Sequence, residues 1–177
     1  MSEQIVMISH VLVTQLAFIS CFTAGCAKVV IPTGNEFTGE TGGCGSFMVY
    51  RFNDDKTLAV EVRVDEKVFA VQDAPIEVEI AAGSKTAFVE VLQFRRPAIS
   101  YFCDDVGGDA PPIATWKAVS GRIAIERYEV VPAVTAGDAR HKVTVVLRNV
   151  RLRHVKSGQE ATLSEVRIDD VLVGWQA

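Results

Sequence analysis

The chain has 177 residues, 18 of them lysine or arginine and 22 aspartate or glutamate, and 49% of its residues are hydrophobic. This length and apolar content suit one folded domain and exclude an intrinsically disordered chain. The net charge of −4 and the pI of about 5.4 argue against a nucleic-acid binder, because such proteins carry an excess of basic residues or a concentrated basic stripe.

The most apolar stretch spans residues 5–26, and Glu3 is the only charged residue before Lys28. His10, Thr14 and Gln15 interrupt the apolar part of this stretch, so it suits an export signal better than a permanent membrane span. We therefore predict a signal peptide over residues 1–25.

A cysteine preceded by small residues ends this stretch, in the run Ala24-Gly25-Cys26. The run resembles the lipobox of bacterial lipoprotein precursors, in which small residues precede a cysteine that receives a diacylglyceryl group and becomes the first residue. The resemblance covers only this segment. It implies a lipid on Cys26 that holds the protein at a membrane; Cys21 is a poorer second candidate. An ordinary cleaved signal peptide and an uncleaved membrane anchor are the alternatives.

The four cysteines stand at positions 21, 26, 44 and 103. If the first leaves with the signal and the second is acylated, Cys44 and Cys103 remain. An exported chain meets an oxidising compartment, so we predict a disulfide between these two, with a pair of buried reduced thiols as the alternative. The chain has no C-x-x-C motif, so a structural zinc site has little support.

Residues 27–43 are rich in glycine and threonine. This composition predicts a lipid-anchored flexible tether over residues 26–43 and a folded domain over residues 44–177.

Within that domain, apolar residues alternate with polar ones in short runs, which predicts β-strands with one buried face. The runs span residues 47–52, 58–64, 76–80 and 88–94. Polar residues at 53–56 and 156–159 predict the turns of two hairpins.

Three longer strands are predicted over residues 113–131, 142–155 and 160–175. In the second of these strands, the alternating apolar residues stand at odd positions before Asn149 and at even positions after it. One inserted residue, a β-bulge, would explain this change. The pattern predicts an all-β fold, a mostly antiparallel β-sandwich, with a closed β-barrel as the alternative.

An acidic loop follows Cys103 and contains Asp104, Asp105 and Asp109 with two glycines. Calcium prefers oxygen ligands in flexible loops, so these residues are a candidate metal site. Loops of this composition are more often solvated connections.

A basic series runs along one predicted hairpin, and its guanidinium groups suit phosphate or carboxylate binding. The candidate anion-binding residues are Arg148, Arg151, Arg153, Lys156 and Arg167. The alternative is a solvated strand face, where charge discourages edge-to-edge aggregation.

Acid-base chemistry would be available to Asp138, His141 and His154. The sequence contains no nucleophile motif such as G-x-S-x-G beside them. We therefore assign no catalytic residue and no cofactor other than the candidate calcium ion.

Together these observations predict an exported, membrane-tethered lipoprotein with a non-catalytic binding or structural role in the bacterial cell envelope. Ala27 is not the aspartate that keeps some bacterial lipoproteins at the inner membrane, so the resemblance implies the outer membrane or its periplasmic face. The partners would be the membrane and an envelope protein or polymer, with no nucleic acid. One alternative is a secreted module that binds carbohydrate or another anionic envelope component, with calcium. A less favoured one is an envelope hydrolase.

Overall fold

The computed structural model describes residues 28–68, 75–104, 111–132 and 140–174. These residues form eight strands and one short 3-10 helix, η1 (Glu66–Val68). The strands are β1 (Thr41–Cys44), β2 (Met48–Phe52), β3 (Leu58–Val64), β4 (Ile76–Ala81), β5 (Ala87–Gln93), β6 (Ala114–Val131), β7 (Arg140–His154) and β8 (Glu160–Val173). No helix in the described ranges is long and apolar enough to cross a membrane. The all-β prediction is confirmed.

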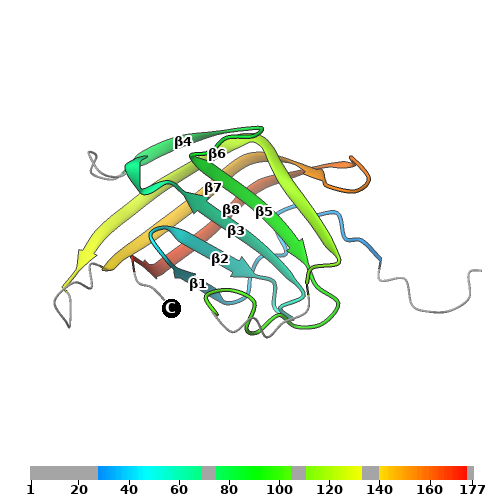
Figure 1. The fold of residues 1–177 in the computed structure, drawn as a ribbon, viewed down its shortest axis with the longest axis horizontal. Helices are drawn as coiled ribbons and strands as arrows, with labels where there is room; N and C mark the ends of the chain where they lie inside the picture. Colours follow the sequence, from blue (N-terminus) through cyan, green and yellow to red (C-terminus); the bar gives the residue numbers. More distant parts are fainter. Residues whose placement is uncertain (1–27, 69–74, 105–110, 133–139, 175–177) are drawn as a thin grey trace, which may run out of the picture.

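All eight strands belong to one antiparallel sheet, in the order β1-β2-β3-β5-β6-β7-β8, with β4 paired to β6 (Figure 1). Strand β6 has 18 residues, so its first part pairs with β5 and its middle part with β4. The predicted hairpin turns at 53–56 and 156–159 connect β2 to β3 and β7 to β8, as expected.

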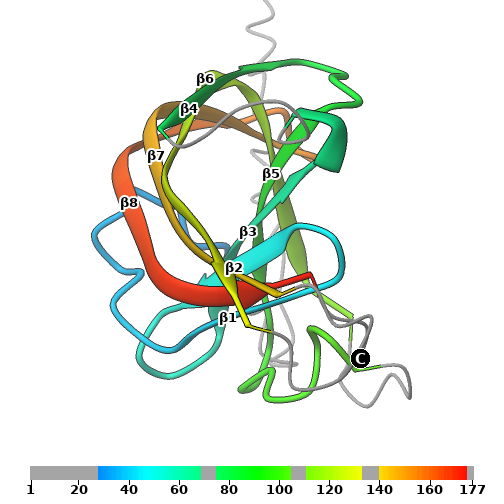
Figure 2. The ribbon, with the colours of Figure 1, turned by 90° about the vertical axis from the view of Figure 1, so that its left-hand side faces the viewer.

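The sheet twists and curls back on itself, so that it forms a half-barrel (Figure 2). Its two ends meet where the Gly174 amide donates a hydrogen bond to the Gly45 carbonyl over 2.7 Å. Further along this seam, the Ser164 amide donates to the Thr33 carbonyl over 3.3 Å. Backbone bonds therefore join β8 to residues that precede β2 in the chain.

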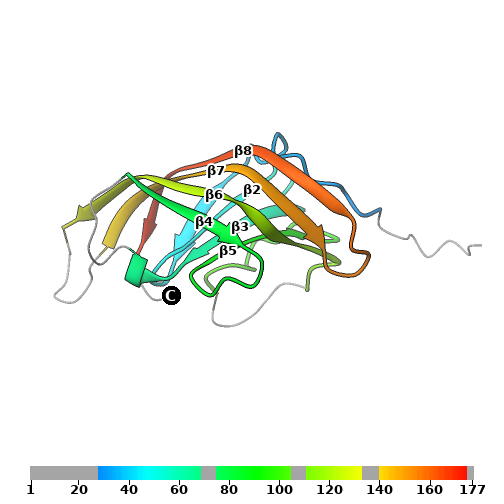
Figure 3. The ribbon, with the colours of Figure 1, turned by 90° about the horizontal axis from the view of Figure 1, so that it is seen from above.

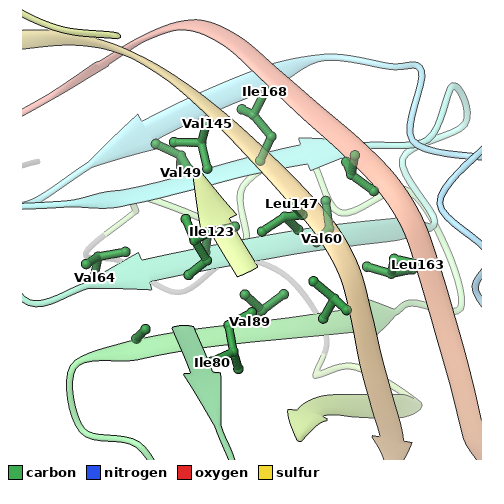
Figure 4. Packing of buried hydrophobic residues seen from close by; sticks show 14 of the residues in the cluster. Val49, Val60, Val64, Ile80, Val89, Ile123, Val145, Leu147, Leu163 and Ile168 are labelled. Atoms are coloured by element: carbon green, nitrogen blue, oxygen red, sulfur yellow. The ribbon is translucent and has the colours of Figure 1, made fainter. Parts of the chain in front are cut away.

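Apolar side chains fill the concave side of the half-barrel (Figure 4). Alternate residues of each strand point inward, among them Val60 from β3, Leu147 from β7 and Ile168 from β8, each fully buried. Burying these side chains, at about 25 cal/mol per Å² of apolar surface, is the main stabilising contribution. The concave side is therefore the protein's core, and binding surfaces have to lie outside it.

The β-bulge predicted near Asn149 is confirmed. Ser120 pairs with Arg151 and Arg122 with Arg148, so Gly121 alone faces two residues of β7. Asn149 has a φ of 50°, a left-handed conformation that asparagine tolerates better than most residues. Because of the bulge, the odd-numbered apolar residues before Asn149 and the even-numbered ones after it all point into the core.

The N-terminal part of the described chain differs from the predicted tether. The Gln93 side chain accepts a hydrogen bond from the Val30 amide and donates one to the Lys28 carbonyl, each over 2.9 Å. Phe37 is only 3% exposed and belongs to the main core. The folded part therefore includes residues 28–43, because a buried aromatic ring and backbone bonds along the seam outweigh the glycine-rich composition.

The predicted signal peptide over residues 1–25 and the predicted lipid site at Cys26 lie outside the described residues. Both stay predictions.

Candidate functional site

A second apolar cluster lies on the convex side of the sheet, beneath the loop of residues 94–104. Its buried members are Phe52, Ala59, Leu92, Phe94, Ala98 and Phe102. The Phe102 ring stacks on Tyr50 of β2, with 4.3 Å between ring centroids. The loop thus covers outward-facing positions of β2, β3 and β5 that would otherwise meet solvent.

The disulfide predicted between Cys44 and Cys103 is confirmed, with 5.8 Å between the two Cα atoms. It ties the end of the covering loop to β1. The bond closes a loop of 59 residues, so it restricts the unfolded chain strongly and holds the loop on the sheet in the folded one.

Two carboxylates face each other beside this cluster. Glu61 on β3 and Glu90 on β5 are register partners, and Lys117 on β6 is the next partner in the same row. Directly opposed residues of antiparallel strands project from the same face, so these three side chains are neighbours. The Lys117 ammonium lies 3.0 Å from Glu90, and the Arg63 guanidinium donates a hydrogen bond to Glu61.

Glu61 is 5% exposed although it lies on the convex side. Burial raises the pKa of its carboxyl, Arg63 opposes the rise, and Glu90 adds to it. Burial also raises the pKa of the Tyr101 hydroxyl, and the charges of Glu61 and Glu90 raise it further. The covering loop and the carboxylate pair are therefore electrostatically coupled.

The carboxylates border a surface hollow of about 290 Å³, lined by Glu61, Arg63, Phe88, Glu90 and Lys117. The Phe88 ring, from the row next to the carboxylates, is 45% exposed. The hollow thus offers hydrogen-bond acceptors, two cations and one flat apolar surface. Such a set suits the binding of a polar organic ligand such as a sugar or a peptide.

The predicted anion-binding residues lie along β7, β8 and the turn between them. Glu126 brings two of these residues together, because it accepts hydrogen bonds from Arg148 and from Arg167, each over 2.7 Å. These bonds, with Arg167 contributing most, lower the pKa of Glu126.

The other three lie apart from this pair. Arg153 donates to Glu160 over 2.9 Å, Arg151 is exposed on β7, and Lys156 is exposed in the β7–β8 turn. Because carboxylates already neutralise three of the four arginines, anion binding by this series stays a prediction that competes with internal ion pairing.

Of the candidate calcium ligands, Asp104 is described, whereas Asp105 and Asp109 lie outside the described residues. In the part of the chain that the structure describes, no group of three or more His, Cys, Asp or Glu side chains could hold a metal ion. Calcium binding by the acidic loop stays a prediction.

The histidines considered for acid-base chemistry lie at opposite ends of β7. His141 stacks on Tyr128 with 4.2 Å between ring centroids, and burial lowers its pKa. His154 Nδ1 accepts hydrogen bonds from the Ser157 amide over 3.2 Å and from the Ser157 hydroxyl over 2.7 Å. The structure does not bring them together, and Asp138 lies outside the described residues.

Sequence reasoning missed the Glu61–Glu90 pair. The alternating pattern places both residues on the polar face of their strands. Their meeting depends on β3 pairing with β5 while β4 pairs elsewhere, a topology that the pattern does not contain.

Comparisons with known proteins identify no relative of this chain: no family model, no curated protein and no solved structure matches it.

Proposed function

We propose that the protein is an exported lipoprotein, tethered to a membrane of the bacterial cell envelope through Cys26, with a non-catalytic binding or structural role. The Cys44–Cys103 disulfide is the observation that carries this proposal. Disulfides persist in oxidising compartments and are rare in the bacterial cytosol, so the bond supports export.

The arrangement of the chain supports the tether. The apolar stretch of residues 5–26 and Cys26 immediately precede Lys28, which is already held against the sheet by Gln93. A lipid on Cys26 would therefore keep the whole domain at the membrane, facing the outer membrane or the periplasm.

The filled half-barrel supports a role carried out on the convex surface. The hollow beside Glu61 and Glu90 brings together two carboxylates and two cations, and an envelope protein or polymer would bind there.

A second candidate is a secreted binding module for carbohydrate or another envelope component, favoured by the exposed Phe88 ring in the hollow. If calcium assists it through Asp104 and its neighbours, added calcium will raise the melting temperature. Replacing Asp104 with alanine will then remove the shift, whereas a calcium-independent melting temperature contradicts the calcium part of this candidate.

Metabolic labelling with an alkyne-tagged fatty acid tests the tether. The full-length protein is expected to incorporate the label, and Cys26→Ser is expected to lose it. Cys21→Ser is the matched control, because it removes a cysteine five positions upstream, and it should keep the label. An unlabelled wild-type protein, or label that survives in Cys26→Ser, contradicts the proposal.

A further inference from the structure

One end of the half-barrel gathers the termini of seven strands. Strands β2, β5 and β7 end there, and β1, β3, β6 and β8 begin there, as their pairing register requires. The described chain also starts at this end, where Gln93 binds the Lys28 carbonyl and the Val30 amide. Figures 1 and 3 both show the start of the described chain and the β7–β8 turn projecting in this direction. We call this the entry end.

Exposed apolar side chains gather at the entry end. Five of the eight exposed large apolar residues of the described ranges lie there, between 37% and 73% exposed: Val29, Val30, Ile31, Ile99 and Val155. Hydrogen bonds fix the position of the last two. The Ala98 amide, next to Ile99, donates to Lys56 in the β2–β3 turn, and the Val155 amide donates to Thr115 at the start of β6.

The entry end also carries unpaired cations. Four exposed basic residues there form no ion pair within the described residues: Lys28, Arg95, Arg96 and Lys156. Acidic side chains at this end are already bound: Thr38 donates to Asp54, Thr57 donates to Asp55, and Arg153 donates to Glu160. The unpaired positive charge therefore lies beside the exposed apolar side chains.

The covalent chain limits how far this end can be from Cys26. Only Ala27 separates Cys26 from Lys28, and two residues span at most roughly 7 Å. Because Gln93 holds Lys28 and Val30 on the sheet, no long flexible linker follows. A lipid on Cys26 therefore brings the entry end, rather than a side of the half-barrel, to the membrane.

We propose that the entry end docks on an anionic phospholipid surface. Its apolar side chains insert into the headgroup region, and Lys28, Arg95, Arg96 and Lys156 bind lipid phosphates. This inference rests on the proposed lipid tether, which supplies the proximity. It also gives the domain a fixed orientation, with the end of β6 and the start of β7, where Val131 pairs with Arg140, farthest from the bilayer.

Hydrogen exchange on the full-length protein tests the docking. The protein purified from native membranes is reconstituted into vesicles of phosphatidylcholine alone, or of equal parts phosphatidylcholine and phosphatidylglycerol. Amides of residues 28–31, 95–99 and 155–157 are expected to exchange at least about fivefold more slowly in the anionic vesicles, since each basic residue at such a surface contributes about that factor. Residues 82–86, in the β4–β5 turn, should exchange equally in both.

Charge reversal supplies a matched pair of variants. Arg95→Glu/Lys156→Glu is expected to abolish the difference between the two vesicle types. Lys67→Glu/Lys85→Glu makes the same change in charge away from the entry end, after β3 and before β5, and should keep the difference. Equal exchange of the wild-type protein in both vesicles overturns the docking. Slower exchange that depends on the density of protein in the vesicles, and not on lipid charge, also overturns the docking. That result would indicate contact with a second copy of the chain.

The intact mass of the same sample separates this inference from the proposed function. Slowed exchange without a lipid on Cys26 supports the docking and contradicts the tether. A lipid on Cys26 with unchanged exchange in both vesicle types supports the tether and contradicts the docking.

Discussion

Glu61 shows how a single side chain depends on structure far from it in sequence. Alternation along β3 turns it away from the main core, yet it is 5% exposed. Its register partner Glu90 lies on the neighbouring strand β5, and the Arg63 guanidinium donates a hydrogen bond to its carboxylate and compensates its charge. A partly compensated buried carboxylate is destabilising relative to a neutral side chain of the same shape.

We expect Glu61→Gln to change how stability depends on pH. The folded-state pKa of Glu61 lies above its unfolded value of about 4.5, so ionisation is harder in the folded protein. Wild-type stability therefore falls relative to the variant as pH rises from about 4.5 through the folded pKa, and the difference is constant above it. Urea denaturation between pH 4 and pH 8 measures this difference.

Glu79→Gln is the control for losing one formal charge, because the Glu79 side chain is 75% exposed on β4. A stability difference between wild type and Glu61→Gln that stays constant across this pH range contradicts the account of Glu61.

Some residue-scale features follow from the sequence and others do not. The sequence predicts the bulge at Asn149 because the apolar residues change from odd to even positions there, and this alternation can be read from a few neighbouring residues. The meeting of Glu61 with Glu90 depends on β3 pairing with β5, which no local pattern records. The ion pairs of Arg148 and Arg167 are hidden for the same reason, since Glu126 lies on a third strand.

At the scale of elements, the loop of residues 94–104 and its disulfide form one structural unit. The loop buries Ala98 and Phe102 against the sheet, and Cys103 joins its end to β1. This unit covers the convex face next to the hollow, whose own lining comes from β3, β5 and β6.

Replacing Cys44 and Cys103 together with serine is expected to lower the free energy of unfolding by about 4 kcal/mol, the chain-entropy value for a loop of this length. Urea denaturation measures the loss. In the same variant, proteases are expected to cut near residue 100 before the protein unfolds globally. A loss below about 1 kcal/mol with an intact loop indicates that apolar packing alone holds the loop.

The strands themselves were predictable, whereas their order was not. Period-two alternation marks β3, β4 and β5 clearly, and turn residues mark the β2–β3 and β7–β8 hairpins. Strand β1 was missed because Thr41–Cys44 contains two glycines and no alternating apolar pattern. The pairing of β4 with β6 depends on the length and curvature of β6, which are properties of the whole sheet.

At the scale of the whole molecule, residues 28–40 close the half-barrel. They run along the seam between β8 and β2, where Thr33 accepts a hydrogen bond from Ser164 and Phe37 enters the core. This segment therefore stabilises the domain and also fixes where a lipid on Cys26 would lie. Its composition alone indicated a tether, because the binding surface that orders it comes from distant strands.

Phe37→Ala is expected to lower the free energy of unfolding by about 3–5 kcal/mol, as for other fully buried aromatic residues. Phe88→Ala is the matched control, since it removes the same side chain from a position that is 45% exposed. Thermal and urea denaturation of both variants give the comparison. If both variants lose the same small free energy of unfolding, residues 28–40 are not packed on the domain, and the flexible tether is favoured.

We propose that a lipid on Cys26 holds this disulfide-bonded half-barrel at an envelope membrane. Unreduced peptide mass spectrometry of the protein taken from native membranes tests it most directly. We predict an N-terminal peptide that begins at Cys26 and carries a diacylglyceryl group, together with a linked pair of peptides containing Cys44 and Cys103. An unmodified chain that begins at Met1 and contains free thiols contradicts both the tether and the export.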